Sequence, residues 1–279
     1  MNGTAVNPTL LSEIHERVRF VNRQWWCRLV VKGRRDSAGP GFFDNYPRFF
    51  ITSVTAAKPD RLNLRYRALI ESNFEIIAGR RILDLASHDG RWSLAADRAG
   101  AAHVLGIEAR ARLIEAANSN MREYGVPEKQ VEFIQGDVLA ELDRLDPGRF
   151  DTVFCLGFLY HIIDHMPLLR KIARLKPKNL IIDTVVSVRP TIAIEIRDEE
   201  IEDESNGAIG EPGFPLRTVS GKPTKPALEL MLRAAGFQPP RYYDWLHAGI
   251  QRWDDVADYY IGTRVSLTSE AATGNLAGN

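Results

Sequence analysis

Four groups of polar residues stand at the ends of apolar stretches, and their chemistry could hold and transform a ligand. Asp84 lies near the end of the first stretch, Glu108 ends the second, and Asp137 follows the third. Tyr160 and His161 come shortly after the fourth. Carboxylates accept hydrogen bonds from hydroxyl and amino groups, and a histidine can take up a proton near neutral pH. The spacing therefore predicts a binding site equipped for acid–base chemistry.

The first group lies within a stretch that predicts a strand, a tight turn and the start of a helix. Ile82–Leu85 is apolar except for Asp84, Ser87–Gly90 breaks the pattern, and helical spacing resumes over Trp92–Ala95. Gly90 lets the backbone approach a ligand closely, and the helix N-terminus offers unpaired N–H groups. This sequence is typical of the opening of a nucleotide-binding βαβ unit.

Strand-like and helix-like segments alternate beyond this turn, which predicts a parallel sheet covered on both faces. The expected strands are 82–86, 102–108, 131–135, 151–156 and 179–185, with helices over 91–99, 112–124, 138–145 and 166–175 between them. A helix over 227–235 and two antiparallel edge strands, 241–245 and 258–267, follow later. The predicted fold class is α/β, with a doubly wound, mostly parallel seven-stranded sheet.

The flanking segments predict a division of the chain into parts. Residues 1–60 form an N-terminal extension, with a helix over 10–31 and an aromatic-rich stretch over 41–53 that fills a groove on the core. Residues 61–268 form the main domain, which begins with a helix over 62–77 and carries an inserted hairpin or lid at 188–224. Residues 269–279 are small and polar, typical of a flexible tail.

Composition limits the possible partners. The chain has 36 basic and 36 acidic residues among 279, so its net charge of zero disfavours a generic nucleic-acid binder. Two cysteines are too few for a disulfide framework or a thiolate metal cage. No apolar run approaches the ~20 residues of a membrane span, so we expect no membrane association and a cytoplasmic location. Homo-oligomer formation stays open.

The four groups together resemble the class I S-adenosylmethionine-dependent methyltransferases over roughly Ile77 to Leu267. The stretch from Asp84 to Gly90 matches the cofactor loop, except that Ala86 and His88 replace two of its three glycines. The resemblance implies S-adenosyl-L-methionine as cofactor, with Glu108 as the ribose-binding acid and Asp137 as the adenine-side acid. The cofactor-binding residues that it implies are Asp84, Ala86, His88, Gly90, Glu108, Asp137, Val138 and Leu156.

Residues in and after the fourth expected strand resemble one branch of these methyltransferases in particular. The sequence from Phe154 to His161, followed by Ile181–Thr184, looks like the branch containing tRNA wobble-uridine carboxymethyltransferases and small-molecule O-methyltransferases. We expect methyl transfer to a hydroxyl of a polar small molecule, a sugar or secondary metabolite, with His161 as general base and Tyr160 shaping the pocket. Alternatives are a small-molecule N-methyltransferase, a tRNA-modifying enzyme and a cofactor-binding regulator without turnover. The acidic run 198–204 disfavours tRNA.

A divalent metal is a further alternative. His161, Asp164 and Asp183 could together bind a metal ion that holds two oxygens of a diol. Asp183 could equally orient His161. Because nothing in the spacing requires a metal ion, the main prediction contains none.

Overall fold

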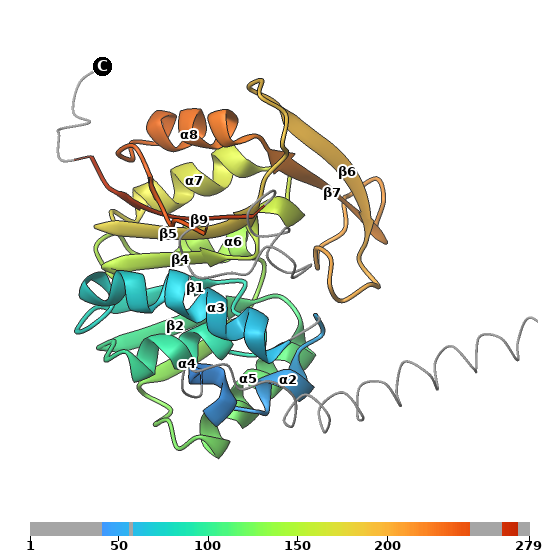
Figure 1. Cartoon of the computed structure of the whole chain (residues 1–279). Helices are drawn as coiled ribbons and strands as arrows, with labels where there is room; N and C mark the ends of the chain where they lie inside the picture. Colours follow the sequence, from blue (N-terminus) through green and yellow to red (C-terminus); the bar gives the residue numbers. More distant parts are fainter. Residues whose placement is uncertain (1–40, 56–57, 246–263, 273–279) are drawn as a thin grey trace, which may run out of the picture. The chain divides into compact units, whose positions relative to one another are not determined.

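A seven-stranded sheet forms the centre of the computed structural model, which describes residues 41–55, 58–245 and 264–272. The strand order is β3-β2-β1-β4-β5-β9-β8, and the first five of these strands are parallel (Figure 1). Strands β9 and β8 are antiparallel and form one edge. The predicted α/β fold, doubly wound and mostly parallel, is therefore confirmed.

The elements follow the predicted order, but the strand expected over 241–245 ends at Tyr242, and the last strand continues to Glu270, into the expected tail. The strands are β1 Arg81–Leu85, β2 His103–Glu108, β3 Val131–Gln135, β4 Thr152–Leu156, β5 Asn179–Val185, β6 Ile194–Glu200, β7 Arg217–Pro223, β8 Arg241–Tyr242 and β9 Arg264–Glu270. The α-helices are α2 Phe49–Thr52, α3 Pro59–Leu69, α4 Arg91–Arg98, α5 Ala111–Glu123, α6 Val138–Arg144, α7 His165–Arg174 and α8 Lys225–Ala234. Short 3-10 helices are η2 Phe42–Asn45, η3 Glu71–Ile76 and η4 Leu159–His161.

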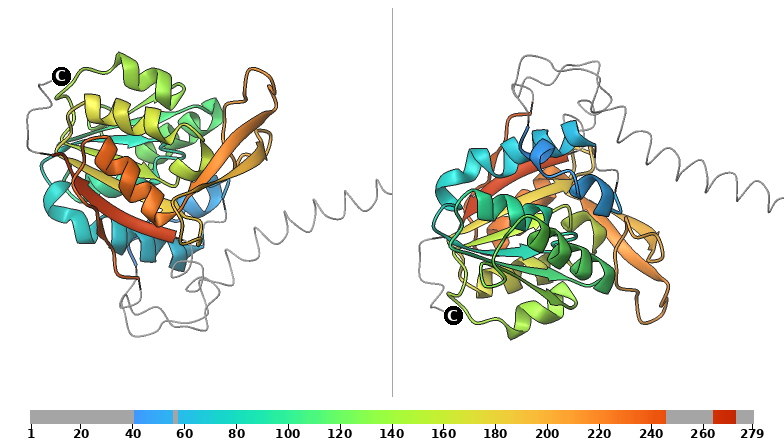
Figure 2. Two further views of the ribbon diagram at one scale, coloured as in Figure 1. Left: turned by 90° about the horizontal axis from the view of Figure 1, so that it is seen from above. Right: turned by 90° about the horizontal axis from the view of Figure 1, so that it is seen from below.

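Apolar side chains cover both faces of the sheet, as the continuous hydrophobic strands require. Leu83 and Leu85 face one way, toward a core shared with α6, α7 and α8. Ile82 and Val104 face the other way, toward a core shared with α3, α4 and Met121 of α5. Figure 2 shows helices on both sides of the sheet. Among the described residues, no helix has both the length and the apolar character needed to cross a bilayer.

The described residues from Phe42 onward form one compact unit, which includes the aromatic stretch. Phe43 and Phe49 are fully buried, which confirms that this stretch packs into the core. Phe42 stacks on Tyr66 of α3 with ring centroids 4.1 Å apart. The helix expected over 10–31, residues 258–263 of the last expected strand and residues 273–279 of the expected tail lie outside the described residues.

The helix expected over 62–77 is wrong in its second half. Helix α3 ends at Leu69, and η3 follows with non-helical backbone angles at Asn73. The buried Asn73 side chain donates to the carbonyls of Ala68 and Leu69, and it accepts a hydrogen bond from Thr268 of β9 at 2.6 Å. A side-chain donor that competes for helix carbonyls interrupts the regular pattern.

A buried ion cluster ties α3 to the sheet. The carboxylate of Asp183 on β5 is fully buried and pairs with Arg65 of α3 and with Arg264 of β9. The Nε of Arg264 lies 3.0 Å from both carboxylate oxygens, and the Ser266 hydroxyl donates to one of them at 2.8 Å. Burial alone would raise the pKa of Asp183, but the two guanidinium groups hold it well below its usual value.

Replacing Asp183 by Asn should lower the free energy of unfolding by about 3–5 kcal/mol at pH 7, because two buried guanidinium groups lose their counter-charge. A carboxyl with a lowered folded-state pKa stabilises above the unfolded pKa near 4, and this contribution is lost as the pH falls through the folded value. The difference between wild type and Asp183→Asn should therefore shrink below about pH 4. Urea denaturation at several pH values measures both effects.

The control is Asp143→Asn, which removes the partner of Lys171 from an exposed ion pair. Asp143→Asn should lower the free energy of unfolding by less than about 1 kcal/mol. Equal costs for the two substitutions would contradict a structural role for the buried cluster.

Candidate active site

The loop between β1 and α4 keeps an unusual backbone shape despite its low glycine content. Ala86, His88 and Gly90 all have positive φ, at 52°, 57° and 80°. These are the three positions at which the methyltransferase resemblance places glycines. A left-handed conformation costs a non-glycine residue about 1–2 kcal/mol, so other contacts must hold the first two. A Cβ at Gly90 would lie 2.9 Å from Phe133, which explains why a glycine is required there.

Glu108, at the end of β2, provides contacts that hold this loop. One of its carboxylate oxygens accepts the backbone N–H of His88 at 3.0 Å, and the other accepts that of Arg110 at 2.9 Å. The side chain of His88 is fixed as well, because its Nδ1 lies 2.9 Å from a guanidinium nitrogen of Arg91. Arg91 in turn pairs with the buried carboxylate of Asp89 at 2.7 Å. Each oxygen of Glu108 keeps a lone pair for a ligand hydroxyl.

The carboxyl ends of β1, β2 and β4 open into one cavity of about 180 Å³, which the loop before α6 also lines. The predicted site residues that line it are Ala86, His88, Glu108, Asp137, Val138, Leu156, Tyr160 and His161. Asp137 is also the N-cap of α6 and accepts the Ala140 N–H at 2.9 Å, which leaves its other oxygen for a ligand. The sheet thus brings residues from separate strand ends to one place.

Asp84 and Gly90, two further predicted cofactor residues, lie outside the lining of this cavity. Asp84 is buried and accepts a hydrogen bond from Ser93 of α4 at 2.7 Å. Burial raises the pKa of Asp84 to about 7, against the opposing effect of the Ser93 hydrogen bond. Asp84 joins β1 to the helix that follows the loop, and Gly90 begins that helix.

His161 ends η4 and reaches the inserted hairpin. Its Nδ1 lies 3.0 Å from a carboxylate oxygen of Glu199 on β6, and its ring packs on that of Tyr160 with centroids 4.1 Å apart. A carboxylate only accepts hydrogen bonds, so Nδ1 carries the proton and Nε2 of a neutral ring can accept one. Glu199 could not be recognised as a site residue from the sequence, because nothing there distinguishes it from the other residues of the acidic run.

The insert is a hairpin, as expected, and its strands β6 and β7 pair only with each other among the described strands. It extends past the end of the main sheet (Figure 1). The loop between β6 and β7 supplies Glu204–Ile209 to the cavity. The guanidinium of Arg110 donates to the carbonyls of Ile201, Glu204, Asn206 and Gly207 at 3.0–3.3 Å. Arg110, which the sequence did not single out, therefore holds this loop over the cavity.

The structure does not bring the three metal candidates together. Asp183 is enclosed by Arg65, Arg264 and Ser266, so its lone pairs are already used. Asp164 stands at the start of α7, and the cavity lining contains neither aspartate. Within the described residues, no group of three or more His, Cys, Asp or Glu side chains could hold a metal ion. The alternative in which Asp183 orients His161 is wrong as well, because Glu199 contacts its Nδ1.

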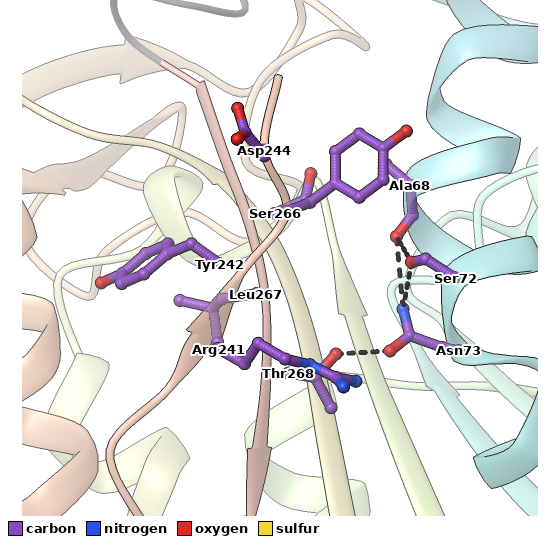
Figure 3. A pocket seen from close by; sticks show the side chains of 10 residues that line it. Ala68, Ser72, Asn73, Arg241, Tyr242, Asp244, Ser266, Leu267 and Thr268 are labelled. Atoms are coloured by element: carbon purple, nitrogen blue, oxygen red, sulfur yellow. Dashed lines mark hydrogen bonds between the residues drawn. The ribbon is translucent and has the colours of Figure 1, made fainter. Parts of the chain in front are cut away.

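A second cavity, of about 380 Å³, lies between η3 and the β8–β9 edge of the sheet (Figure 3). Its lining includes Asn73, Arg241, Tyr242 and Asp244, and none of the predicted site residues. The Thr268 hydroxyl donates to Asn73 across it. The predicted chemistry therefore belongs to the first cavity.

Comparison with known proteins identifies a methyltransferase domain. Residues 82–178 match a sequence family described as a methyltransferase domain. A tRNA U34 carboxymethyltransferase of Pseudomonas syringae pv. syringae is 28% identical over 207 residues, covering 70% of this chain and 59% of that protein. A ubiquinone biosynthesis O-methyltransferase of Neisseria meningitidis serogroup A is 29% identical over 115 residues, covering 41% of this chain and 47% of that protein. The chain thus spans about half of the length of these relatives.

Comparison with solved structures also gives a methyltransferase fold. The N-terminal domain of EvdMO1, crystallised in the presence of S-adenosylhomocysteine and D-fucose, superposes with a TM-score of 0.55 at 21% identity. The match covers 75% of this chain and 82% of that one. Glu108 and Asp137 offer acceptors for ribose hydroxyls and an adenine amino group, and Val138 and Leu156 offer apolar surface, so the cavity fits the family's cofactor. Residues 82–178 thus form a methyltransferase domain, and the sheet has the class I, Rossmann-like methyltransferase fold.

Proposed function

We propose that this protein transfers a methyl group from S-adenosylmethionine to a hydroxyl of a polar small molecule, with a sugar or a secondary metabolite as acceptor. The observation that carries the proposal is the hydrogen bond between His161 and Glu199, at the cavity that also contains the candidate cofactor residues. This bond leaves Nε2 of the ring able to accept a proton.

The cavity divides by chemistry into two halves. Ala86, Glu108 and Asp137 form the half that suits the nucleoside and the amino-acid tail of the cofactor. Tyr160 and His161 follow β4 and form the other half, together with Thr218 of the hairpin. An acceptor between them would meet hydroxyl and imidazole groups, which suits a polar molecule.

The cofactor supplies a methyl carbon bonded to positively charged sulfur, so the protein needs chiefly to align an acceptor oxygen with it. With the cofactor bound, Nε2 of His161 would take the hydroxyl proton as the acceptor oxygen bonds to the methyl carbon and the carbon–sulfur bond breaks, which would leave S-adenosylhomocysteine and a protonated His161. Tyr160 packs on the His161 ring and limits its rotation. The loop after β6 lines the cavity, and exclusion of water from it would favour transfer to the acceptor over side reactions.

A tRNA acceptor is the second candidate, because a carboxymethyltransferase acting on tRNA U34 is similar over 70% of this chain. One structural feature favours it: Arg61, Arg65 and Arg264 line the same cavity and could face a carboxylate on the transferred group. Glu204, which lines the cavity, would repel a polyanion, so we rank this candidate second.

Transfer of radiolabelled methyl groups distinguishes these candidates. The protein is incubated with labelled S-adenosylmethionine and, separately, with D-fucose, D-glucose, catechol or bulk tRNA. We expect label in at least one of the small molecules. Label in tRNA alone would replace a small-molecule acceptor by tRNA, and no label in any acceptor would contradict methyl transfer to both kinds of acceptor.

Replacing Glu108 by Ala should weaken cofactor binding at least tenfold, because a charged hydrogen-bond acceptor contributes about 1.5–3 kcal/mol. Calorimetric titration with S-adenosylhomocysteine measures the change. Glu132→Ala, on the exposed part of β3, is the control and should bind as wild type does. Unchanged affinity in Glu108→Ala would argue against a ribose-binding role for this carboxylate.

Replacing His161 by Ala should lower kcat by about 10²- to 10⁴-fold, because the acceptor hydroxyl loses its proton acceptor. Affinity for S-adenosylhomocysteine should stay at the wild-type value. His103→Ala removes a histidine at the far end of β2 and should retain full turnover. The general-base role would be wrong if His161→Ala kept near-normal turnover at saturating acceptor.

A further inference from the structure

Glu199 comes from the insert, outside the part of the chain that matches the methyltransferase domain. Its neighbours on β6 include Glu195 and Asp198, whose side chains are exposed. The side chain of Glu199 is only 14% exposed, and that of His161 is 15% exposed. One carboxylate of an otherwise solvated acidic run is therefore turned inward, toward a ring at the cavity.

Several contacts fix Glu199 in this position. The oxygen that faces His161 also accepts the backbone N–H of Gly207 at 3.3 Å. A Cβ at Gly207 would lie 2.8 Å from Thr218 and 3.0 Å from the His161 carbonyl oxygen, so the loop fits closely against η4. Arg110 holds the other side of this loop through four carbonyls. The position of Glu199 thus depends on the hairpin, its loop and the Arg110 side chain.

The electrostatics favour a stable hydrogen bond between Glu199 and His161. Burial alone would raise the pKa of Glu199, but the hydrogen bond and charge of His161 lower it below its ordinary value. At neutral pH Glu199 is therefore ionised and accepts from Nδ1. A neutral imidazole has two tautomers, and a fixed acceptor on one nitrogen selects the tautomer whose other nitrogen is free of a proton.

We propose that Glu199 is the positioning residue of the active site: it holds His161 in the tautomer whose Nε2 accepts the acceptor's proton, so that the insert completes the catalytic machinery. This proposal rests on the proposed function, in which His161 is the base. Glu199 itself touches neither substrate nor cofactor and acts through the ring.

The tautomer can be measured without any acceptor. The full-length protein, labelled with ¹⁵N-histidine and saturated with S-adenosylhomocysteine, gives long-range ¹H–¹⁵N spectra of its six histidines. The His161 signals are assigned from their loss in His161→Ala. We expect a proton on Nδ1 in wild type and a mixture of tautomers in Glu199→Gln, because the amide can also donate to Nδ1. Thermal melting of each variant verifies its fold.

The matched control is Glu195→Gln, on the same strand four residues earlier, where the carboxylate pairs with the exposed Arg197. Its His161 signals should match those of wild type. Unchanged His161 signals in a folded Glu199→Gln would overturn the proposal. Because this test needs no turnover, its result is separate from any failure of the proposed methyl transfer.

Kinetics then test the consequence with whichever acceptor from the panel is methylated. Glu199→Gln should lower kcat by about 10- to 100-fold and leave KM for that acceptor nearly unchanged, because only the share of correctly protonated rings falls. Glu195→Gln should keep the wild-type kcat. A Glu199→Gln enzyme with altered tautomers and full kcat would show that the tautomer does not matter to the reaction, which would overturn the positioning role.

Discussion

The carboxylate of Glu108 is the contact on which the site depends, because its two oxygens join two loops. One oxygen holds the loop after β1 through the His88 N–H, and the other holds the start of the loop after β2 through the Arg110 N–H. The Arg110 side chain then holds the loop of the insert. A single buried acid thus connects the left-handed turn with the hairpin, across segments far apart in the sequence.

Two parts of the molecule build the site: the sheet, which is common to open α/β folds, and the insert. The parallel sheet and its two cores create a cavity at the carboxyl ends of the strands, a property of open α/β folds. The insert lines part of that cavity and brings Glu199 to His161. Substrate specificity in such an arrangement comes from the added elements, since fold alone does not determine function.

Most of the sheet could be predicted from the sequence, because its strands are continuous apolar runs and its helices have regular spacing. The helix expected over 227–235 is present as α8, and the Thr224 hydroxyl caps it by accepting the Ala227 N–H. The break at Asn73 could not be predicted, because a side chain that donates to nearby helix carbonyls leaves the apolar spacing unchanged. The low glycine content of the cofactor loop gave no sign of its left-handed backbone, which Ala86 and His88 adopt, with the His88 N–H held by Glu108.

Four strand-end groups were found in the sequence because each stands at the end of a local apolar pattern. Glu199 and Arg110 were missed because their roles depend on pairing between distant segments, 38 residues apart for the bond from His161 to Glu199. The metal alternative failed for a related reason: the guanidinium groups that enclose Asp183 come from residues 118 and 81 positions away.

A crystal structure of the protein with S-adenosylhomocysteine would show directly whether this cavity binds the cofactor. We expect the ribose hydroxyls to contact Glu108, the adenine to lie beside Asp137, and the sulfur to face the Tyr160–His161 half of the cavity. A ligand bound elsewhere, such as in the cavity beside Asn73 and Tyr242, would contradict this expectation.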